Sequence, residues 1–142
     1  MSIRLIEVED FPELYDLLTQ LMTKNPPNRS KMELAFREAL DDPMVKIGVF
    51  DDGQEIVGMI SVSVHHTLHH SGWVALVDEM VVSEKVRRQG VGKDLMDWAK
   101  VEARKLGADT LELHSAVYRK DAYAFYQSLG FKPISHVFST KL

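Results

Sequence analysis

The sequence predicts an α/β fold: one domain over residues 1–142, built on a mixed, mostly antiparallel central sheet flanked by helices. Three observations lead to this prediction. With 142 residues, 45% of them hydrophobic, the chain can bury one sizeable core. Short segments rich in Val and Ile alternate with longer segments whose apolar residues have helical spacing. No repeat, low-complexity tract or Gly/Ser linker divides the chain.

The first elements are expected to be one strand and two helices. Apolar residues nearly alternate over Ser2–Val8, as in a strand. Leucines at helical spacing predict a helix over Phe11–Thr23 with Asp10 as its N-cap. A second helix is expected over Lys31–Leu40, capped by Ser30.

A meander of three antiparallel strands is expected next, over Met44–Phe50, Glu55–His65 and Gly72–Val82. The Asp52-Gly53 pair between the first two is typical of a hairpin turn. The remaining elements alternate, and their order completes a mixed sheet: a helix over Val91–Leu106, a strand over Asp109–Val117, a helix over Lys120–Leu129 and a final strand over Ser135–Leu142.

Composition narrows the function classes. Seventeen Lys and Arg against 21 Asp and Glu give a net charge of −4, which argues against a general nucleic-acid binder. Without cysteine the chain has no disulfide, thiolate metal site or thiol nucleophile. No segment has the apolar length of a membrane span or the pattern of a signal peptide, so a cytoplasmic protein without a membrane partner is expected.

A glycine-rich turn is expected between the third meander strand and the strongest helix, in the segment Arg87-Arg88-Gln89-Gly90-Val91-Gly92-Lys93. Two glycines at the start of a helix let backbone N–H groups approach an anion, and Glu84–Lys105 has a local charge of +3. The alternative is a tight turn beside a solvated basic face. The patterns of the P-loop and of the dinucleotide-binding fold are both absent.

Two segments resemble signatures of the GCN5-related N-acetyltransferase (GNAT) family. Arg87–Gly92, after the strand Leu76–Val82, is similar to the acetyl-CoA signature Arg/Gln-x-x-Gly-x-Gly/Ala. Ala122–Phe131 resembles the second signature, Ala-x-x-Phe-Tyr-x-x-x-Gly-Phe. The resemblance implies the GNAT fold, in which the strand here spanning Thr110–Ala116 splays away from its neighbour and leaves a slot for the cofactor.

The resemblance also implies roles in binding acetyl-CoA. Backbone amides of Arg88–Lys93 would hold the pyrophosphate, with Arg87 and Arg88 adding charge, and pantetheine would lie along Met80–Val82. Many family members have Asn where this chain has Arg119, which could instead reach a CoA phosphate. The expected cofactor-binding residues are therefore Met80, Val81, Val82, Arg87, Arg88, Gln89, Gly90, Val91, Gly92, Lys93, Arg119 and Tyr126.

Two residues are expected to carry the chemistry. Tyr126 matches the family position that commonly protonates the CoA sulfur. It also belongs to an apolar stripe with Ala122, Phe125 and Leu129, which fits a core aromatic residue as well. Glu79 could take the amine proton through water, with Asp78 as the alternate base; a carboxylate at the end of a strand near basic residues is also a common salt-bridge partner.

Four histidines form the other conspicuous cluster: His65, His66, His69 and His70. No carboxylate with ligand spacing lies beside them, so an exposed turn is expected rather than a metal site. His114 and His136 lack partners for a hydrolase triad.

The expected function is transfer of an acetyl group from acetyl-CoA to a primary amine by direct attack in a ternary complex. Candidate acceptors are a polyamine, an amino sugar or aminoglycoside, an amino acid, and a protein N-terminus or lysine. The acceptor site is expected among Lys24–Ser30, His65–His70 and the chain near Ser115 and His136. Alternatives are a CoA-binding module without catalysis and an ATP-binding regulator. Dimers are frequent in the family, so a homodimer is one expected state.

Overall fold

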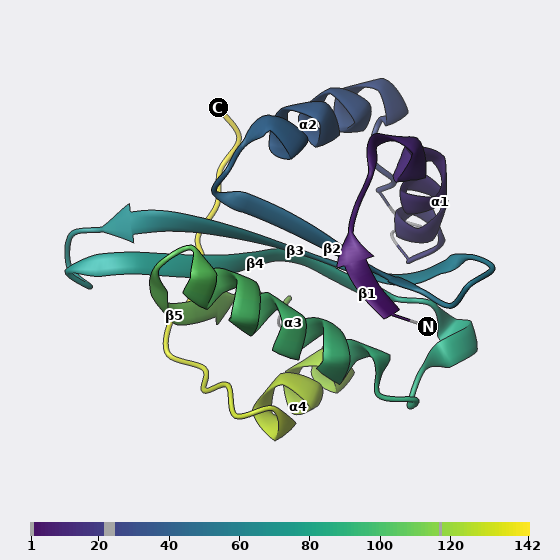
Figure 1. The fold of residues 1–142 in the computed structure, drawn as a ribbon. Coiled ribbons are helices and arrows are strands. Elements are labelled where there is room, and N and C mark those ends of the chain that lie inside the picture. The colour runs from purple at the N-terminus through teal and green to yellow at the C-terminus, as the bar shows by residue number, and fades with distance from the viewer. Residues whose placement is uncertain (1, 22–24, 117) are drawn as a thin grey trace. The chain divides into compact units, whose positions relative to one another are not determined.

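The computed structural model describes residues 2–21, 25–116 and 118–142. The chain forms two compact units, Met1–Glu112 and Leu113–Leu142. The described residues form an open five-stranded sheet in the order β1-β2-β3-β4-β5, together with four α-helices (Figure 1). The β4–β5 pair is parallel and the other three neighbouring pairs are antiparallel. The predicted α/β class with a mixed, mostly antiparallel sheet is confirmed.

Most predicted elements are present, with bounds that shift by a few residues. The strands are β1 Ser2–Leu5, β2 Val45–Asp51, β3 Ile56–Thr67, β4 Gly72–Val82 and β5 Ala108–Leu113. The helices are α1 Phe11–Leu21, α2 Arg29–Asp41, α3 Val91–Lys105 and α4 Lys120–Ser128, with short 3-10 helices η1 Val8–Asp10 and η2 Glu84–Val86. Parts of three expected segments, residues 22–24 and 117, lie outside the described residues.

The expected cap of α1, Asp10, directly precedes Phe11, whereas the expected cap of α2 is wrong. Asp10 ends η1 and accepts a hydrogen bond from the Glu7 amide at 2.7 Å, so its carboxylate closes the turn before α1. The α2 helix starts earlier than expected, because the Asn28 side chain accepts the Lys31 amide at 3.0 Å. Ser30, the expected cap, instead donates its hydroxyl to Asn28 at 2.9 Å. Asparagine, a strong N-cap residue, therefore precedes the predicted serine.

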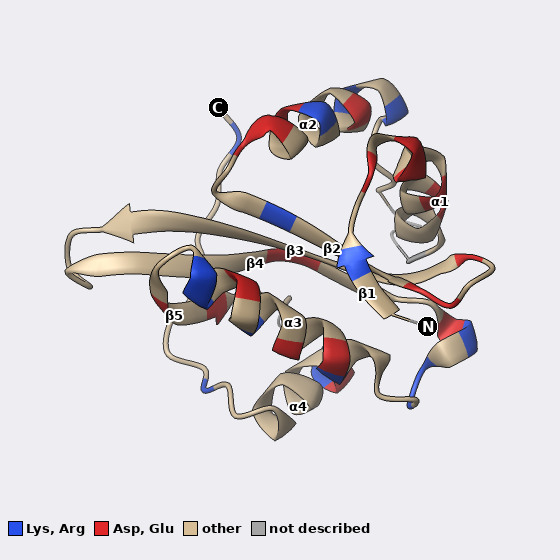
Figure 2. Ribbon diagram, in the orientation of Figure 1, with Lys and Arg blue, Asp and Glu red and all other residues tan. Residues whose placement is uncertain are grey.

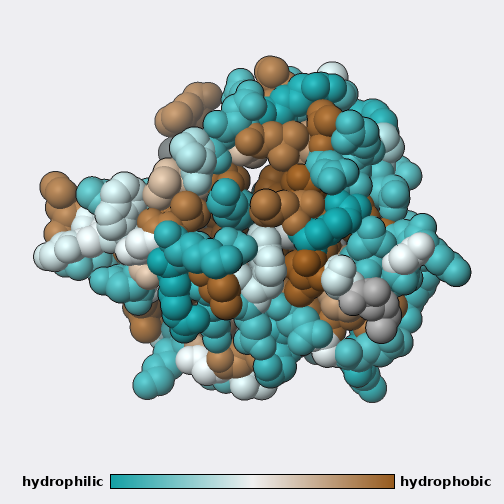
Figure 3. All heavy atoms as spheres, in the orientation of Figure 1, coloured by the Kyte–Doolittle hydropathy of each residue, from teal (hydrophilic) through white to brown (hydrophobic). Residues whose placement is uncertain are grey.

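The helices of the first unit cover both faces of the sheet. Figure 1 shows α1 and α2 over one face and α3 over the other. Apolar residues of α1 and α2 pack on inward side chains of the sheet in one buried cluster: Ile6, Phe11, Leu14, Leu17, Leu18, Phe36, Val49, Ile56 and Met59. In Figure 3 hydrophobic atoms gather in the middle of the view, where this sheet lies, and hydrophilic atoms surround them.

Small residues let α3 lie close to the opposite face. A Cβ atom at Gly48 would lie 2.6 Å from the Trp98 ring, and one at Gly58 would lie 3.0 Å from Leu95. Ile60 and Leu95 are fully buried on this side. The close contact fixes the N-terminal half of α3 against the middle of the sheet.

The β3–β4 ladder contains one irregularity. Ser61 lies opposite Glu79, whereas the next residue of β3, Val62, lies opposite Val77. Asp78 is thus an inserted residue, a β-bulge, on β4. Because Ser61 and Val62 face opposite sides of the sheet, Glu79 and Val77 do so as well.

The second unit consists of α4 and irregular chain. Tyr126 packs on Phe125 and Phe131, with ring centroids 5.6 and 6.2 Å apart. The expected strand over Ser135–Leu142 is wrong, because those residues form no helix or strand and Phe138 is 92% exposed. Apolar residues alone do not make a strand, which also needs a hydrogen-bonded neighbour.

Candidate active site

A tight connection leads from the end of β4 into α3. Ser83 caps η2 by accepting the Lys85 amide, and its own amide donates to the Val57 carbonyl at 2.8 Å, so the chain stays anchored to β3. Arg88 and Gly90 then have positive φ angles of 64° and 84°. Such a backbone is costly for arginine and allowed for glycine, so the turn is held by its surroundings in an uncommon shape.

The first turn of α3 is open to an anion. Gly90 is the N-cap of this fifteen-residue helix and has no side chain that could accept its first amides. A Cβ atom placed on Gly90 would meet nothing within 4 Å, so the approach to these amides is clear. Free N–H groups and the helix dipole together favour a phosphate at this position. The residues present therefore fit the pyrophosphate expected there.

Cations accompany this turn. Arg87 and Arg88 are exposed, and Figure 2 shows blue ribbon between η2 and α3. Arg87 also lies 3.7 Å from Glu84, a distant and exposed ion pair. Lys93 is engaged by Asp97 at 2.7 Å, which raises the pKa of its ammonium group. Of the cations expected here, the two arginines are better placed than Lys93 to add charge.

The last residues of β4 precede this turn. Met80, Val81 and Val82 pair with Ile60, Met59 and Gly58 on the β3 side. Val81 also packs against the cluster under α1 and α2. Pairing with β3 therefore holds one edge of β4 in place, and the other neighbour of β4 in the sheet is β5.

A serine and a carboxylate face each other across β3 and β4. The Ser61 hydroxyl donates to Oε2 of Glu79 and accepts the Glu79 amide at 3.1 Å. Ser61 is buried with 4% of its surface exposed. It lies two residues from Met59, a member of the cluster under α1 and α2, so the pair is on that face of the sheet.

The surroundings of Glu79 favour its protonated form. Burial of the carboxylate raises its pKa, and the negative charge of Asp78 acts in the same direction. The Ser61 hydrogen bond opposes both by stabilising the ionised form. Glu79 thus combines solvent access on its strand with a carboxylate that binds a proton more strongly than usual, which suits a general base.

Tyr126 and Arg119 lie in the second unit. Tyr126 is half-buried on α4, and burial raises the pKa of its phenol, whereas the charge of Arg119 opposes that shift. Arg119 is exposed at the N-cap of α4 and makes no capping hydrogen bond with its side chain. Within this unit the hydroxyl of Tyr126 stays protonated at neutral pH.

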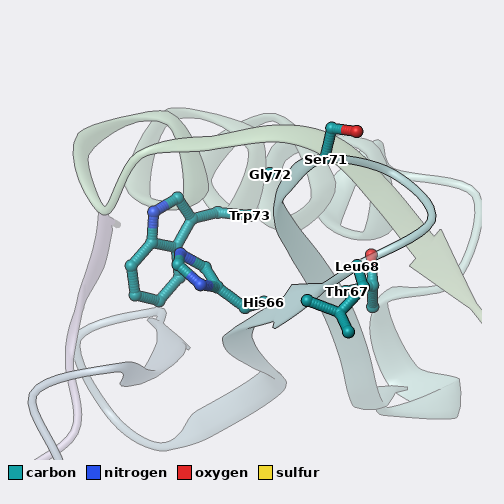
Figure 4. Close-up of a pocket in the computed structure, with 6 residues that line it drawn as sticks. All are labelled: His66, Thr67, Leu68, Ser71, Gly72 and Trp73. Carbon is teal, nitrogen blue, oxygen red and sulfur yellow. The ribbon is translucent and has the colours of Figure 1, made fainter.

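The histidines lie at the other end of β4. The His66 and Trp73 rings pack at a centroid distance of 3.6 Å, and His70 Nδ1 lies 2.8 Å from the Thr67 hydroxyl. Figure 4 shows the shallow hollow here, about 300 Å³, lined by His66, Thr67, Leu68, Ser71, Gly72 and Trp73. Across residues 2–21, 25–116 and 118–142, no three His, Asp or Glu side chains gather as a metal site.

Strand length separates this hairpin from Glu79. Glu79 lies seven residues after Gly72, about 23 Å along an extended strand at the usual rise. A small amine held at Glu79 is beyond the reach of the hairpin. The expectation that His65–His70 help to build the acceptor site stays a prediction, and the strand sets the hairpin well away from Glu79.

Sequence analysis missed Ser61 and the bulge at Asp78. Two signals were available: Ser61 and Ser63 interrupt an otherwise apolar strand, and Asp78-Glu79 interrupts the next one. Neither signal reveals which serine faces which carboxylate, since one inserted residue changes the pairing.

Comparisons with known proteins agree with this arrangement. The model of the acetyltransferase (GNAT) family matches residues 11–131. An aminoalkylphosphonate N-acetyltransferase of Salmonella typhimurium is 36% identical over 99% of this chain and 90% of its own length.

Solved structures have the same fold over their whole length. A transcriptional regulator from Bacillus halodurans superposes with a TM-score of 0.90 at 28% identity, covering 99% of both chains. Glucosamine-6-phosphate N-acetyltransferase from Arabidopsis thaliana gives a TM-score of 0.82 at 21% identity, covering 99% of this chain and 97% of the other.

Proposed function

Since the chain belongs to the acetyltransferase (GNAT) family and is an N-acetyltransferase, we propose that it moves an acetyl group from acetyl-CoA to a primary amine in a ternary complex. The uncapped first turn of α3 beside Arg87 and Arg88 supports this proposal most directly. Family members use acetyl-CoA as their co-substrate. The amides of Arg88–Lys93 would hold its pyrophosphate, and the backbone of Met80–Val82 would hold pantetheine.

Two side chains would then move protons. Acetyl-CoA supplies a thioester carbon, to which the amine nitrogen bonds while the CoA thiolate leaves. Glu79 would accept the proton lost by the amine, through water, and its raised pKa makes it a better base than an ordinary carboxylate. Tyr126 would donate a proton to the thiolate, and its raised pKa keeps the hydroxyl protonated beforehand. Arg119 is proposed to contact a CoA phosphate.

The proposed acceptor is a small primary amine that bears a phosphonate group. This proposal rests on the similarity to the Salmonella enzyme, which extends over nearly the full chain. The net charge of −7 outside Glu84–Lys105 argues instead for a cationic acceptor such as a polyamine. A panel that contains both kinds of amine separates the two cases.

Release of CoA from acetyl-CoA tests the function. Because the chain contains no cysteine, a thiol reagent detects the released CoA alone. The panel pairs aminoalkylphosphonates of one to three carbons with aminocarboxylates of equal length, and adds a polyamine and an aminoglycoside. We expect kcat/KM to be highest for a phosphonate. Equal rates for the carboxylate partners, or preference for the polyamine, would refute the proposed acceptor.

A variant at Tyr126 separates the enzyme from a CoA-binding module. Tyr126→Phe keeps the ring contacts within its unit and removes only the proposed proton donor. We expect kcat to fall at least about 100-fold, the usual size for a general acid, with unchanged acetyl-CoA affinity. Binding of acetyl-CoA by the wild type, without turnover of any amine, would favour the CoA-binding module.

Three expectations stay predictions. These are the homodimer, the cytoplasmic location and a single domain over residues 1–142. Among the described residues no helix is long and apolar enough to cross a membrane.

A further inference from the structure

We propose that Ser61 is a positioning residue that holds the Glu79 carboxylate ready to take the proton of the amine. The inference rests on the proposed function, because it takes Glu79 to be the base. It assigns a part in the reaction to Ser61, a residue of β3 for which the sequence alone indicated no role.

The first support is the double contact between the two residues. The Ser61 hydroxyl donates to Oε2 of Glu79 and accepts the Glu79 amide at 3.1 Å. One hydroxyl therefore ties both the side chain and the backbone of Glu79. Such a contact restricts the rotation of a glutamate, which otherwise has three freely turning bonds.

The second support is burial. Ser61 has 4% of its surface exposed, while Glu79 keeps access to solvent. A buried serine hydroxyl needs a hydrogen-bond acceptor, and Oε2 of Glu79 supplies it. The hydroxyl is thus fixed, and the carboxylate that meets substrate rests on a rigid partner.

The bulge at Asp78 creates this pair. In a regular strand Glu79 would share the face of Val77, which is 94% buried and lies opposite Val62. The inserted residue turns Glu79 to the other face and sets it opposite Ser61. An unpaired carboxylate on the α3 side would be costly to bury. The bulge thus serves to bring the base to its partner.

Few other groups act on Glu79. Ser61 reaches it from β3, and Asp78, on β4 itself, is the nearby charge. In the described part of the chain no Lys, Arg or His forms an ion pair with Glu79. Burial and Asp78 raise the pKa of Glu79, and the Ser61 hydrogen bond lowers it. Ser61 therefore lowers the pKa of Glu79 against the combined effect of burial and of Asp78.

The test compares Ser61→Ala with Ser61→Thr and Ser63→Ala. Loss of the Ser61 hydroxyl removes stabilisation of the ionised carboxylate, so the pKa of Glu79 must rise. Since a base works when ionised, the acidic limb of the kcat/KM profile should move to higher pH by about one unit, the size of one hydrogen bond. Threonine keeps the hydroxyl and should restore the wild-type limb.

Ser63→Ala is the matched control. Ser63 lies on the same strand and face as Ser61, opposite Leu76. Its replacement by alanine removes the same hydroxyl group. Its pH profile should match the wild type. A shift of equal size in Ser63→Ala and Ser61→Ala would overturn the inference, because a general loosening of β3 would then explain both.

A direct titration works even without turnover. The carboxyl carbon of Glu79, followed by nuclear magnetic resonance with labelled glutamate, gives its pKa in the wild type and in Ser61→Ala; the Glu79→Gln spectrum identifies the signal. An unchanged pKa would refute the inference, whatever the amine assays give.

A double variant separates this inference from the proposed function. If Ser61 acts through Glu79, Ser61→Ala should cost no further activity once Glu79→Gln is present. An additional loss in that background would overturn the inference. Full activity of Glu79→Gln alone would instead refute Glu79 as the base, and with it the premise.

Discussion

Two polar clusters lie near opposite ends of β4, and they differ in how their contacts arise. At the hairpin end, His66 packs on Trp73 and Thr67 contacts His70, all within eight residues of chain. At the other end, Ser61 and Glu79 meet from positions 18 residues apart, and an open helix start follows. The conspicuous histidines form a local turn, whereas the inconspicuous serine belongs to the candidate site. Side chains that tertiary pairing brings together deserve more weight than residues that are merely dense in sequence.

The largest expected effect comes from a charge at the helix start. Gly90→Glu places a carboxylate beside the proposed pyrophosphate, and repulsion between like charges at short range should lower acetyl-CoA affinity more than about 100-fold. Isothermal titration calorimetry with acetyl-CoA measures the change.

Gly53→Glu is the matched control for that variant. Gly53 also has a positive φ, 95° against 84°, and a Cβ there also meets nothing within 4 Å. The two variants share the added charge and the backbone strain, and differ only in whether the charge lies at the start of α3. Equal loss of affinity in both would refute the assignment of the α3 start as the anion site.

The next effect concerns the base. Glu79→Gln keeps the size of the side chain but cannot accept the proton, so kcat should fall about 100-fold, typical for a general base. Affinity for acetyl-CoA should stay within about twofold, which calorimetry checks beside steady-state rates. A large loss of affinity with normal kcat would place Glu79 in binding instead.

A third change tests how α3 is held against the sheet. Gly48→Ala would bring a methyl group to 2.6 Å from the Trp98 ring, and both groups are packed. Overpacking of this kind costs about 1–3 kcal/mol of unfolding free energy. Urea denaturation gives the difference. A gain in stability would mean that the ring can move aside, and that the start of α3 is less firmly fixed than proposed.

The smallest effect is expected at the hairpin. His66→Ala removes the ring packed on Trp73, about 20 Å of strand from Glu79. Steady-state kcat/KM with the preferred amine should stay within about twofold of the wild type. A loss above tenfold would contradict the contrast between the two ends of β4, and would place the hairpin in the acceptor site.

The sequence determined the elements formed by near neighbours in the chain. Helical spacing located α1, α3 and α4, and the three meander strands were found within a few residues of their bounds. The glycine turn was also predictable, because Gly90 and Gly92 before a helix dictate backbone shape locally. The signatures of the two segments Arg87–Gly92 and Ala122–Phe131 identified the family, which its model then matched.

Only the tertiary structure decided what depends on pairing. The bulge at Asp78 sets which face Glu79 occupies, and one inserted residue reverses that face without changing any local propensity. Asn28 caps α2 because its side chain, and not that of Ser30, accepts the Lys31 amide. Ser135–Leu142 forms no strand although its apolar residues suggested one, since a strand is completed by a neighbour and not by its own sequence. Local patterns fix elements; the partner of each polar group follows from the register between distant strands.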